Sequence, residues 1–404
     1  MVVWMNKDEI ETMRKSFNTV KSRSSKLNEF SKVKYLEERV KDIKKFSVDN
    51  FDSLFEETCS SFDRNGIDVE FAETAGDAIA IILDLLKDYD YKVIAKSKSN
   101  TLGEINFKDE MSSNSWEVIE TDLGDRLLQL KKFDNNPVHP TGPASHLNIL
   151  QIADIVNDSL DKDIDPVARE IMEVVREDVL INIKNAQVGI SGANAISAEE
   201  GSCVLVHNEG NISLVSLKEL HIIVAGIDKI VPTLEDAISL AKLETVYATG
   251  NYVTSYMNVI SGPSKTADIE KKLLKNMYGA RKVVVIFLDN GRSKAKKECL
   301  WCIGCGNCLI HCPVYNAVGN EFGFNNYLGG RGVAMSKYIE DDETCFNSGL
   351  YMCTLCGLCT LNCPLAVPTN ELIENLRKSS AEKGFYPKIH GVIKDNIGKN
   401  NSPY

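Results

Sequence analysis

Residues 302–313 read Cys302-Ile-Gly-Cys305-Gly-Asn-Cys308-Leu-Ile-His-Cys312-Pro313, and residues 353–364 repeat the spacing as Cys353-Thr-Leu-Cys356-Gly-Leu-Cys359-Thr-Leu-Asn-Cys363-Pro364. In each copy two residues separate neighbouring cysteines of the first three, and a fourth cysteine follows after three more residues and precedes a proline. Thiolates at this spacing wrap a short loop around one metal group. The duplication predicts a small domain with two related metal-binding loops.

This spacing is that of bacterial ferredoxins, in which the fourth cysteine of each run binds the other cluster of the pair. We therefore predict two 4Fe–4S clusters, the first held by Cys302, Cys305, Cys308 and Cys363 and the second by Cys353, Cys356, Cys359 and Cys312. Glycines inside the runs let backbone N–H groups approach the sulfurs, and such hydrogen bonds tune the reduction potential. The sequence predicts a mainly helical, two-cluster ferredoxin-like domain.

Structural zinc is the alternative for a cysteine-rich segment. A zinc site takes four ligands, usually as two C-x-x-C pairs, so three cysteines per loop leave one ligand surplus in each copy. The spacing therefore favours clusters over zinc. Cys299 and Cys345 lie just upstream of the two runs, and we interpret them as free structural thiols rather than alternative ligands. His311 is interpreted as a neighbour of the ligands or a surface residue.

Composition and charge exclude several classes of function. The chain has 404 residues, 43% hydrophobic content and a net charge of −11, values of an ordinary globular protein without the basic surface that non-specific nucleic-acid binding needs. No apolar run approaches the ~20 residues of a membrane span, and the first residues do not resemble a signal peptide. Cys59 and Cys203 lie far from the runs and are expected to be reduced core thiols. A reducing cytoplasm is the predicted location.

Apolar periodicity divides the chain into four parts: an N-terminal helical segment (1–65), an α/β domain (66–290), the cluster domain (291–380) and a C-terminal tail (381–404). We interpret the N-terminal helices as an outer layer of the α/β domain. The Gly/Ser/Lys-rich residues 290–298 are expected to be a linker, and the Gly/Asn-rich residues 322–332 a loop. Thr369 is the expected N-cap of a helix, and residues 396–404 form a polar, mobile tail.

Strands and helices alternate within the α/β domain. Strands are expected at 68–72, 91–95, 115–121, 187–191, 202–207, 221–226 and 282–288. Helices are expected at 75–88, 122–130, 145–160, 165–183 and 233–243. Strands separated by helices predict a parallel or mostly parallel sheet.

Polar residues after two of the predicted strands are candidates for ligand binding. Lys96 and Lys98 end one strand, where ligands of open α/β sheets sit, so they could bind a carboxylate or phosphate, or be solvated. Gly189 and Gly192 could form an anion-binding turn or a plain tight turn; the segment is not a dinucleotide fingerprint. The scattered histidines are interpreted as packed or surface residues: His139, His146, His207 and His221.

The chain resembles the lactate-utilisation (LUD) iron–sulfur proteins. The likeness is carried by several strings of residues: 96–99 (KSKS), 120–124 (ETDLG), 189–194 (GISGAN), 204–211 (VLVHNEGN), 231–236 (VPTLED), 288–292 (LDNGR) and the first cysteine run with Val314-Tyr315. The resemblance covers about residues 30–380. It implies that residues ~60–290 fold similarly to sugar-phosphate isomerases and CoA transferases. It also implies an electron-transfer subunit of an L-lactate oxidation system.

The resemblance implies partners as well. Residues 397–404 look similar to the end of the cluster domain in heterodisulfide-reductase-like subunits, where a cysteine-rich (CCG) domain follows. The partner expected is a separate cysteine-rich subunit, a flavin-containing dehydrogenase subunit, or both, and a second LUD-type subunit could join them. Iron–sulfur clusters take single electrons and cannot remove a hydride, so this chain is not expected to perform the whole reaction.

Two further functions stay open at this stage. The α/β domain could bind a regulatory ligand while the clusters sense redox state. Alternatively, the likeness to CoA transferases invites a nucleophilic glutamate, for which Glu199, Glu200 and Glu209 are the candidates, although fold does not imply function.

Overall fold

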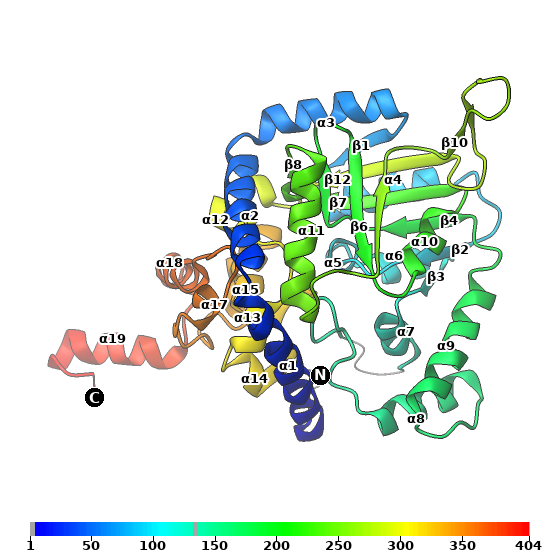
Figure 1. Cartoon of the computed structure of the whole chain (residues 1–404). Coiled ribbons are helices and arrows are strands. Elements are labelled where there is room, and N and C mark those ends of the chain that lie inside the picture. Colours follow the sequence, from blue (N-terminus) through cyan, green and yellow to red (C-terminus); the bar gives the residue numbers. More distant parts are fainter. Residues whose placement is uncertain (1–4, 132–135, 404) are drawn as a thin grey trace.

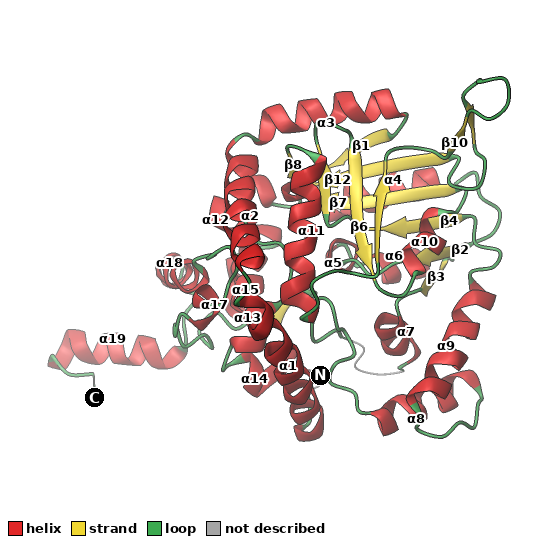
Figure 2. Cartoon of the chain, viewed as in Figure 1, coloured by secondary structure: helices red, strands yellow, loops and turns green. Residues whose placement is uncertain are grey.

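The computed structural model describes residues 5–131 and 136–403. A body built around strands occupies one side of the molecule, a helical region lies beside it, and the C-terminal helix projects away from both (Figure 1). The long strands gather in the first body, and the region after residue 291 is mostly helical (Figure 2).

Three helices form the N-terminal segment, as predicted: α1 (Lys7–Asn28), α2 (Ser31–Asp49) and α3 (Phe51–Asn65). Asn6 caps α1 through a reciprocal pair of hydrogen bonds with Glu9, which fixes where the helix begins. α1 packs against both α11 (Leu234–Thr249) of the α/β domain and α14 (Tyr315–Val318) of the cysteine-rich region. Its buried Phe17 stacks on Tyr315 with 6.3 Å between ring centroids. The segment therefore joins the two domains rather than covering only one.

The main sheet is parallel at every pairing, which confirms the predicted α/β class. Its order is β1-β12-β7-β4-β2-β3, formed by β1 (Asp68–Ala72), β12 (Lys282–Leu288), β7 (Leu220–Gly226), β4 (Val188–Ser191), β2 (Val93–Lys96) and β3 (Glu117–Glu120). Residues 283–288 are all buried, because both faces of the sheet are covered by other elements and the strand must be apolar on both.

Helices cross over between the parallel strands. They are α4 (Ala75–Leu85), α5 (Asn100–Glu104), α6 (Phe107–Ser113), α7 (Leu123–Leu130), α8 (Ile149–Leu160), α9 (Ala168–Asn182) and α10 (Asn211–Ser216). Side chains of β7 alternate between two cores: Ile222 and Val224 point to one face, Ile223 and Ala225 to the other. The predicted helices lie at these places, with ends that differ by a few residues.

A second, mixed sheet was not expected. Its order is β8-β5-β6-β9, formed by β8 (Ile230–Val231), β5 (Ala195–Ser197), β6 (Ser202–His207) and β9 (Tyr256–Ile260). The sequence placed residues 202–207 among the parallel strands, but β6 is antiparallel to β5 and β9. Only residues 198–201 separate β5 from β6, a hairpin connection too short for a parallel crossover. A small hairpin of β10 (Lys265–Thr266) and β11 (Leu274–Lys275) and a 3₁₀ turn, η1 (Ile227–Lys229), complete this domain.

The segment expected to be an open linker is ordered and partly buried. It contains a 3₁₀ turn, η2 (Arg292–Lys294), and α12 (Lys297–Leu300). Arg292 forms a two-pronged ion pair with Glu104, at 2.9 and 2.7 Å, and its Nε donates to Asp228 at 2.8 Å. Tyr327, from the cysteine-rich domain, donates to the same Glu104 carboxylate. A buried ionic network therefore fixes the junction, which glycine and lysine content alone did not reveal.

The cysteine-rich domain is mainly helical, as predicted. After α14 its elements are η3 (Gly319–Glu321), the hairpin β13 (Gly323–Phe324) and β14 (Tyr327–Leu328), α15 (Gly329–Ile339), α16 (Asp342–Asn347), α17 (Leu358–Leu361), α18 (Thr369–Glu382) and α19 (Lys388–Asn400); α13 (Asn307–His311) lies inside the first cysteine run. The predicted loop at 322–332 is thus a hairpin and the first turn of α15.

Two predictions near the C-terminus are wrong. Thr369 is the first residue of α18 and Pro368 occupies the N-cap position, so no side chain caps that end. Most of the predicted polar tail is helical, because α19 continues to Asn400. The helix projects from the molecule (Figure 1), while His390 in its first turn packs against Tyr351 with 5.3 Å between ring centroids. In the part of the chain that the structure describes, no helix is both long enough and apolar enough to cross a membrane.

Candidate iron–sulfur centre and adjoining cavity

Each cysteine run forms a tight loop followed by a short helix. In the first loop Gly304 and Gly306 have φ of 81° and 74°, a left-handed conformation that lets the chain turn back on itself. In the second loop Leu355 and Gly357 occupy the equivalent positions with φ of 55° and 74°. The two loops therefore share one backbone path, even though a leucine replaces one glycine.

The loops bring the eight cysteines together around two cavities. Cys302, Cys305, Cys308 and Cys363 line the first cavity, and Cys353, Cys356, Cys359 and Cys312 line the second. Cys359 also reaches the first cavity and Cys308 the second, so the cavities are neighbours. Each cavity thus combines three cysteines of one run with the fourth of the other, the arrangement that the spacing predicts.

The donor set fits iron–sulfur clusters. Backbone N–H groups donate to the sulfurs: Gly304 to Cys302 and Tyr315 to Cys312, each at 3.4 Å, and Leu355 to Cys353 at 3.5 Å. Burial, and then the neighbouring thiolates, raise the pKa of Cys305 and Cys308 well above the usual range. Converging buried thiolates need a cationic metal group to balance them. Among the described residues, no set of three His, Cys, Asp or Glu side chains is arranged to hold a single metal ion.

The two sites differ in exposure. Cys305 is buried, whereas Cys356 is exposed. Three apolar side chains near the second site are exposed too: Met352 (37%), Leu358 (38%) and Leu361 (80%). A partner could therefore approach the second site more closely than the first.

The remaining cysteines take no part in either cavity. Cys299 and Cys345 are buried and line neither site, and the thiol of Cys345 donates to the carbonyl oxygen of Val333 at 3.3 Å. Burial raises the pKa of both thiols to about 11, so they stay protonated. His311 also lines neither site.

A cavity of about 250 Å³ lies in the α/β domain, directly beside the first cysteine loop. It sits beyond the carboxyl ends of β2, β3 and β4, where ligands of open α/β sheets bind. Lys98, Asp122 and Glu209 line it from the α/β side, and Ile303 and Gly304 from the cysteine loop. Backbone between two cluster cysteines therefore forms part of its wall.

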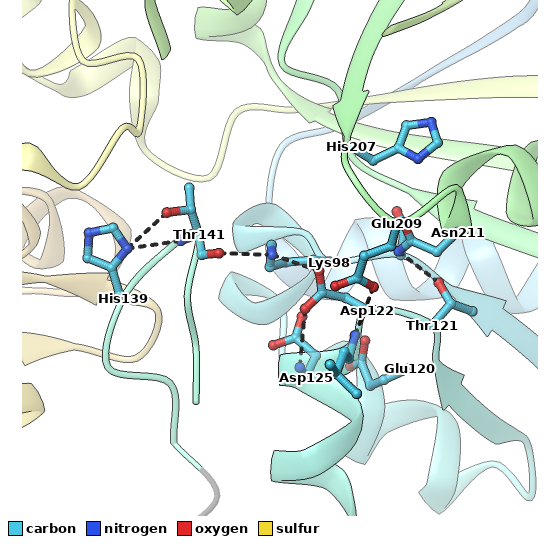
Figure 3. A network of polar contacts seen from close by, with 12 residues as sticks. Lys98, Glu120, Thr121, Asp122, Asp125, His139, Thr141, His207, Glu209 and Asn211 are labelled. Carbon is cyan, nitrogen blue, oxygen red and sulfur yellow. Dashed lines mark hydrogen bonds and ion pairs between the residues drawn. The ribbon is translucent and has the colours of Figure 1, made fainter. Parts of the chain in front are cut away.

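A polar network crosses the floor of this cavity (Figure 3). The Lys98 ammonium pairs with Asp122 at 2.8 Å and donates to the carbonyl of Thr141 at 3.2 Å. Glu209 accepts from the backbone of Leu123 at 3.0 Å, and burial together with the charge of Asp122 raises its pKa. Burial also lowers the pKa of His139 to about 4, so this ring is neutral; its Nδ1 lies 3.3 Å from the Thr141 N–H.

Comparison with known proteins identifies both parts of the chain. Residues 55–288 match the model of the LUD domain, and residues 298–367 match that of the 4Fe-4S dicluster domain. The chain belongs to the LUD-domain family. The dicluster match supports iron–sulfur clusters as the group bound by the cysteine runs.

Several relatives align with most of the chain. Lactate utilization protein B of Geobacillus kaustophilus is 34% identical over 350 residues, 84% of this chain and 71% of the relative. The protein of the same name from Bacillus subtilis is 32% identical over 347 residues, 85% and 70% of the two chains. A solved structure of a DUF162 family protein from Deinococcus radiodurans aligns with 59% of this chain and 98% of its own, with 13% identity and a TM-score of 0.29.

Some of the candidate ligand-binding residues predicted from the sequence line the cavity of the LUD domain, and others lie elsewhere. Lys98, Gly192, His207 and Glu209 line the cavity beside the cysteine loop. Lys96 instead forms a buried ion pair with Glu120 at 2.8 Å, so its interpretation as a solvated strand end is wrong.

The other candidates lie outside the cavity. Glu199 and Glu200 form the β5–β6 turn, and Glu200 accepts from the backbone of Leu234 at 2.8 Å, which holds it at the start of α11. Gly189, His146 and His221 do not line the cavity either.

Sequence reasoning missed three residues that matter here: Lys229, Glu244 and Arg331. The burial of Glu244 could have been predicted, because this residue continues the apolar stripe 237–240–241 of α11. Burial raises the pKa of Glu244, and the charge of Lys229 partly offsets this effect. Lys229 and Arg331 follow no periodic pattern, and only the meeting of the two domains places them beside the cysteine loops.

Proposed function

We propose that this chain is the iron–sulfur electron-transfer subunit of a cytoplasmic, multi-subunit oxidoreductase that oxidises L-lactate or a related 2-hydroxy acid. The observation that carries the proposal is the pairing of two four-cysteine cavities that share lining residues. The names of the relatives, lactate utilization protein B, support the substrate class.

Two 4Fe–4S clusters, when bound, supply the uptake and release of single electrons. The residues of this chain provide the surroundings. Ile303, Leu365 and Val367 line the first site, are buried and exclude water from it. The exposed Cys356 and its apolar neighbours leave the second site open to a partner. Backbone N–H groups aimed at the sulfurs stabilise the thiolates.

The proposed partners are a cysteine-rich subunit, a flavin-containing dehydrogenase subunit, or both, with a second LUD-type subunit in the same assembly. A hydride acceptor is required for 2-hydroxy acid oxidation, and clusters do not serve as one. The apolar side chains near Cys356 support docking at that surface, because exposed apolar patches mark interaction sites.

The test is anaerobic isolation of the complex from its native host. We expect the chain to co-purify with a flavin or cysteine-rich subunit, and L-lactate to reduce the complex. Leu361→Asp, at the exposed second site, should weaken the association, whereas Leu273→Asp, at a 65% exposed side chain of the LUD domain, should not. A chain that is isolated alone and is never reduced by 2-hydroxy acids in cell extract would contradict the proposal.

The cavity of the LUD domain favours a second, compatible function, the binding of a small polar ligand. The Ser97 hydroxyl lines it, is fully buried and has no hydrogen-bond partner among the described residues. The Lys229 side chain lines the same space. Equilibrium titration with L-lactate tests this: binding should weaken in Lys229→Met and persist in the surface variant Lys272→Met, and absence of binding to the wild-type chain would refute it.

A further inference from the structure

Arg331 reaches the space between the two cysteine sites. It is the third residue of α15, which begins where the β13–β14 hairpin ends. A glycine is required at Gly332 for the helix to begin so close to the hairpin, because a Cβ there would lie 2.0 Å from the carbonyl oxygen of Tyr327. The helix is therefore seated directly on the hairpin, and the Arg331 guanidinium lies 5.4 Å from the Tyr327 ring centroid.

The guanidinium is only partly satisfied. Its Nη2 donates to the carbonyl oxygen of Cys299 at 2.8 Å. Its Nε and Nη1 are buried and have no hydrogen-bond partner within the described part of the chain. A buried charged donor without a partner has lost its hydration and gained nothing in return, and native proteins seldom contain one. The two unpartnered nitrogens therefore point to acceptors that are not part of the polypeptide.

The position of the side chain indicates which acceptor. Of the described residues, three line both cysteine cavities: Cys308, Cys359 and Arg331. Arg331 is the only cation among them. Within the plane of the guanidinium, Nε–H and the Nη1 N–H groups point in different directions, which suits two separate acceptors, whereas a lysine ammonium is a single point charge.

We propose that Arg331 donates its Nε–H and Nη1–H groups to sulfur atoms at both iron–sulfur sites and raises the reduction potential of each. The inference rests on the proposed function, because it requires bound clusters. Hydrogen bonds to cluster sulfurs and a nearby positive charge stabilise the more negative, reduced state. Arg331 is thus a positioning residue whose single positive charge affects the reduction potentials of both sites.

The test compares midpoint potentials in the complete chain, purified anaerobically and titrated under electron paramagnetic resonance detection. In Arg331→Gln both potentials should shift to more negative values. Arg331→Lys keeps the charge but loses the fork, so its shift should have the same sign and be smaller. Arg169→Gln, whose side chain is 84% exposed in the LUD domain, is the matched control and should leave both potentials unchanged.

Iron and sulfide content, measured first, separates the possible failures. If the wild-type chain binds no clusters, the proposed function fails, and this inference with it. If the wild type is loaded and Arg331→Gln retains its iron, unchanged potentials, or a shift at one site alone, would overturn the shared role of Arg331. If Arg331→Gln loses iron, Arg331→Lys decides: potentials equal to those of the wild type would overturn the inference.

Discussion

Arg292→Met tests the ionic network that joins the two domains. The Arg292 side chain is 4% exposed, and its partners Glu104 and Asp228 are 0% and 8% exposed. Methionine keeps most of the volume but removes the cation that pairs with both buried carboxylates. Burial alone would raise the pKa of Asp228, but the charges of Arg292, Lys229 and Lys44 outweigh it and hold the pKa well below its usual range. Removing one partner of a buried ion pair costs about 3–5 kcal/mol, and we expect a loss of that size.

Urea denaturation of the anaerobic, iron-loaded chain measures the loss. The unfolding midpoint should move to lower urea at an unchanged slope, since the exposed area on unfolding stays the same. Arg169→Met is the control, because it breaks an exposed i,i+4 pair with Glu173 that is worth below about 0.5 kcal/mol. If Arg292→Met unfolds at the same urea concentration as Arg169→Met, the network does not stabilise the junction and the reasoning fails.

Three further predictions concern the junction, the polar network of the LUD domain and the second cysteine site. Gly291→Ala should destabilise the chain by about 1–3 kcal/mol in the same urea assay, because φ is +84° there and a Cβ would lie 1.9 Å from the carbonyl oxygen of Tyr338. Burial and the charge of Glu120 raise the pKa of Asp125 to about 7. The folded state therefore holds a proton that the unfolded state releases near pH ~4. As a result, the free energy of unfolding falls as the pH rises from about 4 to 7. Asp125→Asn should therefore match the wild type below pH 4 and exceed its unfolding free energy by about 1–2 kcal/mol at pH 8, allowing for partial exposure. Cys356→Ser should lose the iron of the second site and keep that of the first, as measured by metal analysis and electron paramagnetic resonance.

Each of these predictions has a control and a contrary outcome. Gly398→Ala, in the exposed part of α19 with nothing near its Cβ, should be neutral or stabilising by up to about 1 kcal/mol, and an equal loss in both glycine variants would exclude the steric explanation. A pH-independent difference between Asp125→Asn and the wild type would show that Asp125 does not titrate as described. Cys59→Ser, remote from both cysteine runs, should keep all its iron; full iron in Cys356→Ser would remove that cysteine from the ligand set.

Patterns within short segments were sufficient to predict those parts of the fold that depend on neighbouring residues in the sequence. Continuous apolar runs such as 283–288 identified the parallel strands, and the spacing of the cysteines grouped Cys312 and Cys363 with the opposite runs. Which strands pair with one another was harder to predict from the sequence. Residues 202–207 look like any buried strand, and only the short connection after Ser197 shows that they belong to an antiparallel hairpin.

The junction shows why part of the site escaped prediction. Gly291 and Arg292 have the composition of an exposed linker, yet Gly291 is required by contact with α15 and Arg292 by two distant carboxylates. Lys229 and Arg331 likewise acquire their roles only when the two domains meet. No periodicity within one segment records such contacts, because each partner lies far away in the sequence.

The most direct test of the central claim is the metal content of the anaerobically purified chain, with acid-labile sulfide and the reduced-state electron paramagnetic resonance spectrum recorded on the same sample. We expect about eight irons and eight sulfides per chain and the signal of two neighbouring 4Fe–4S clusters. Zinc in place of iron, or about four irons with a single isolated signal, would contradict the assignment of both cysteine cavities to clusters.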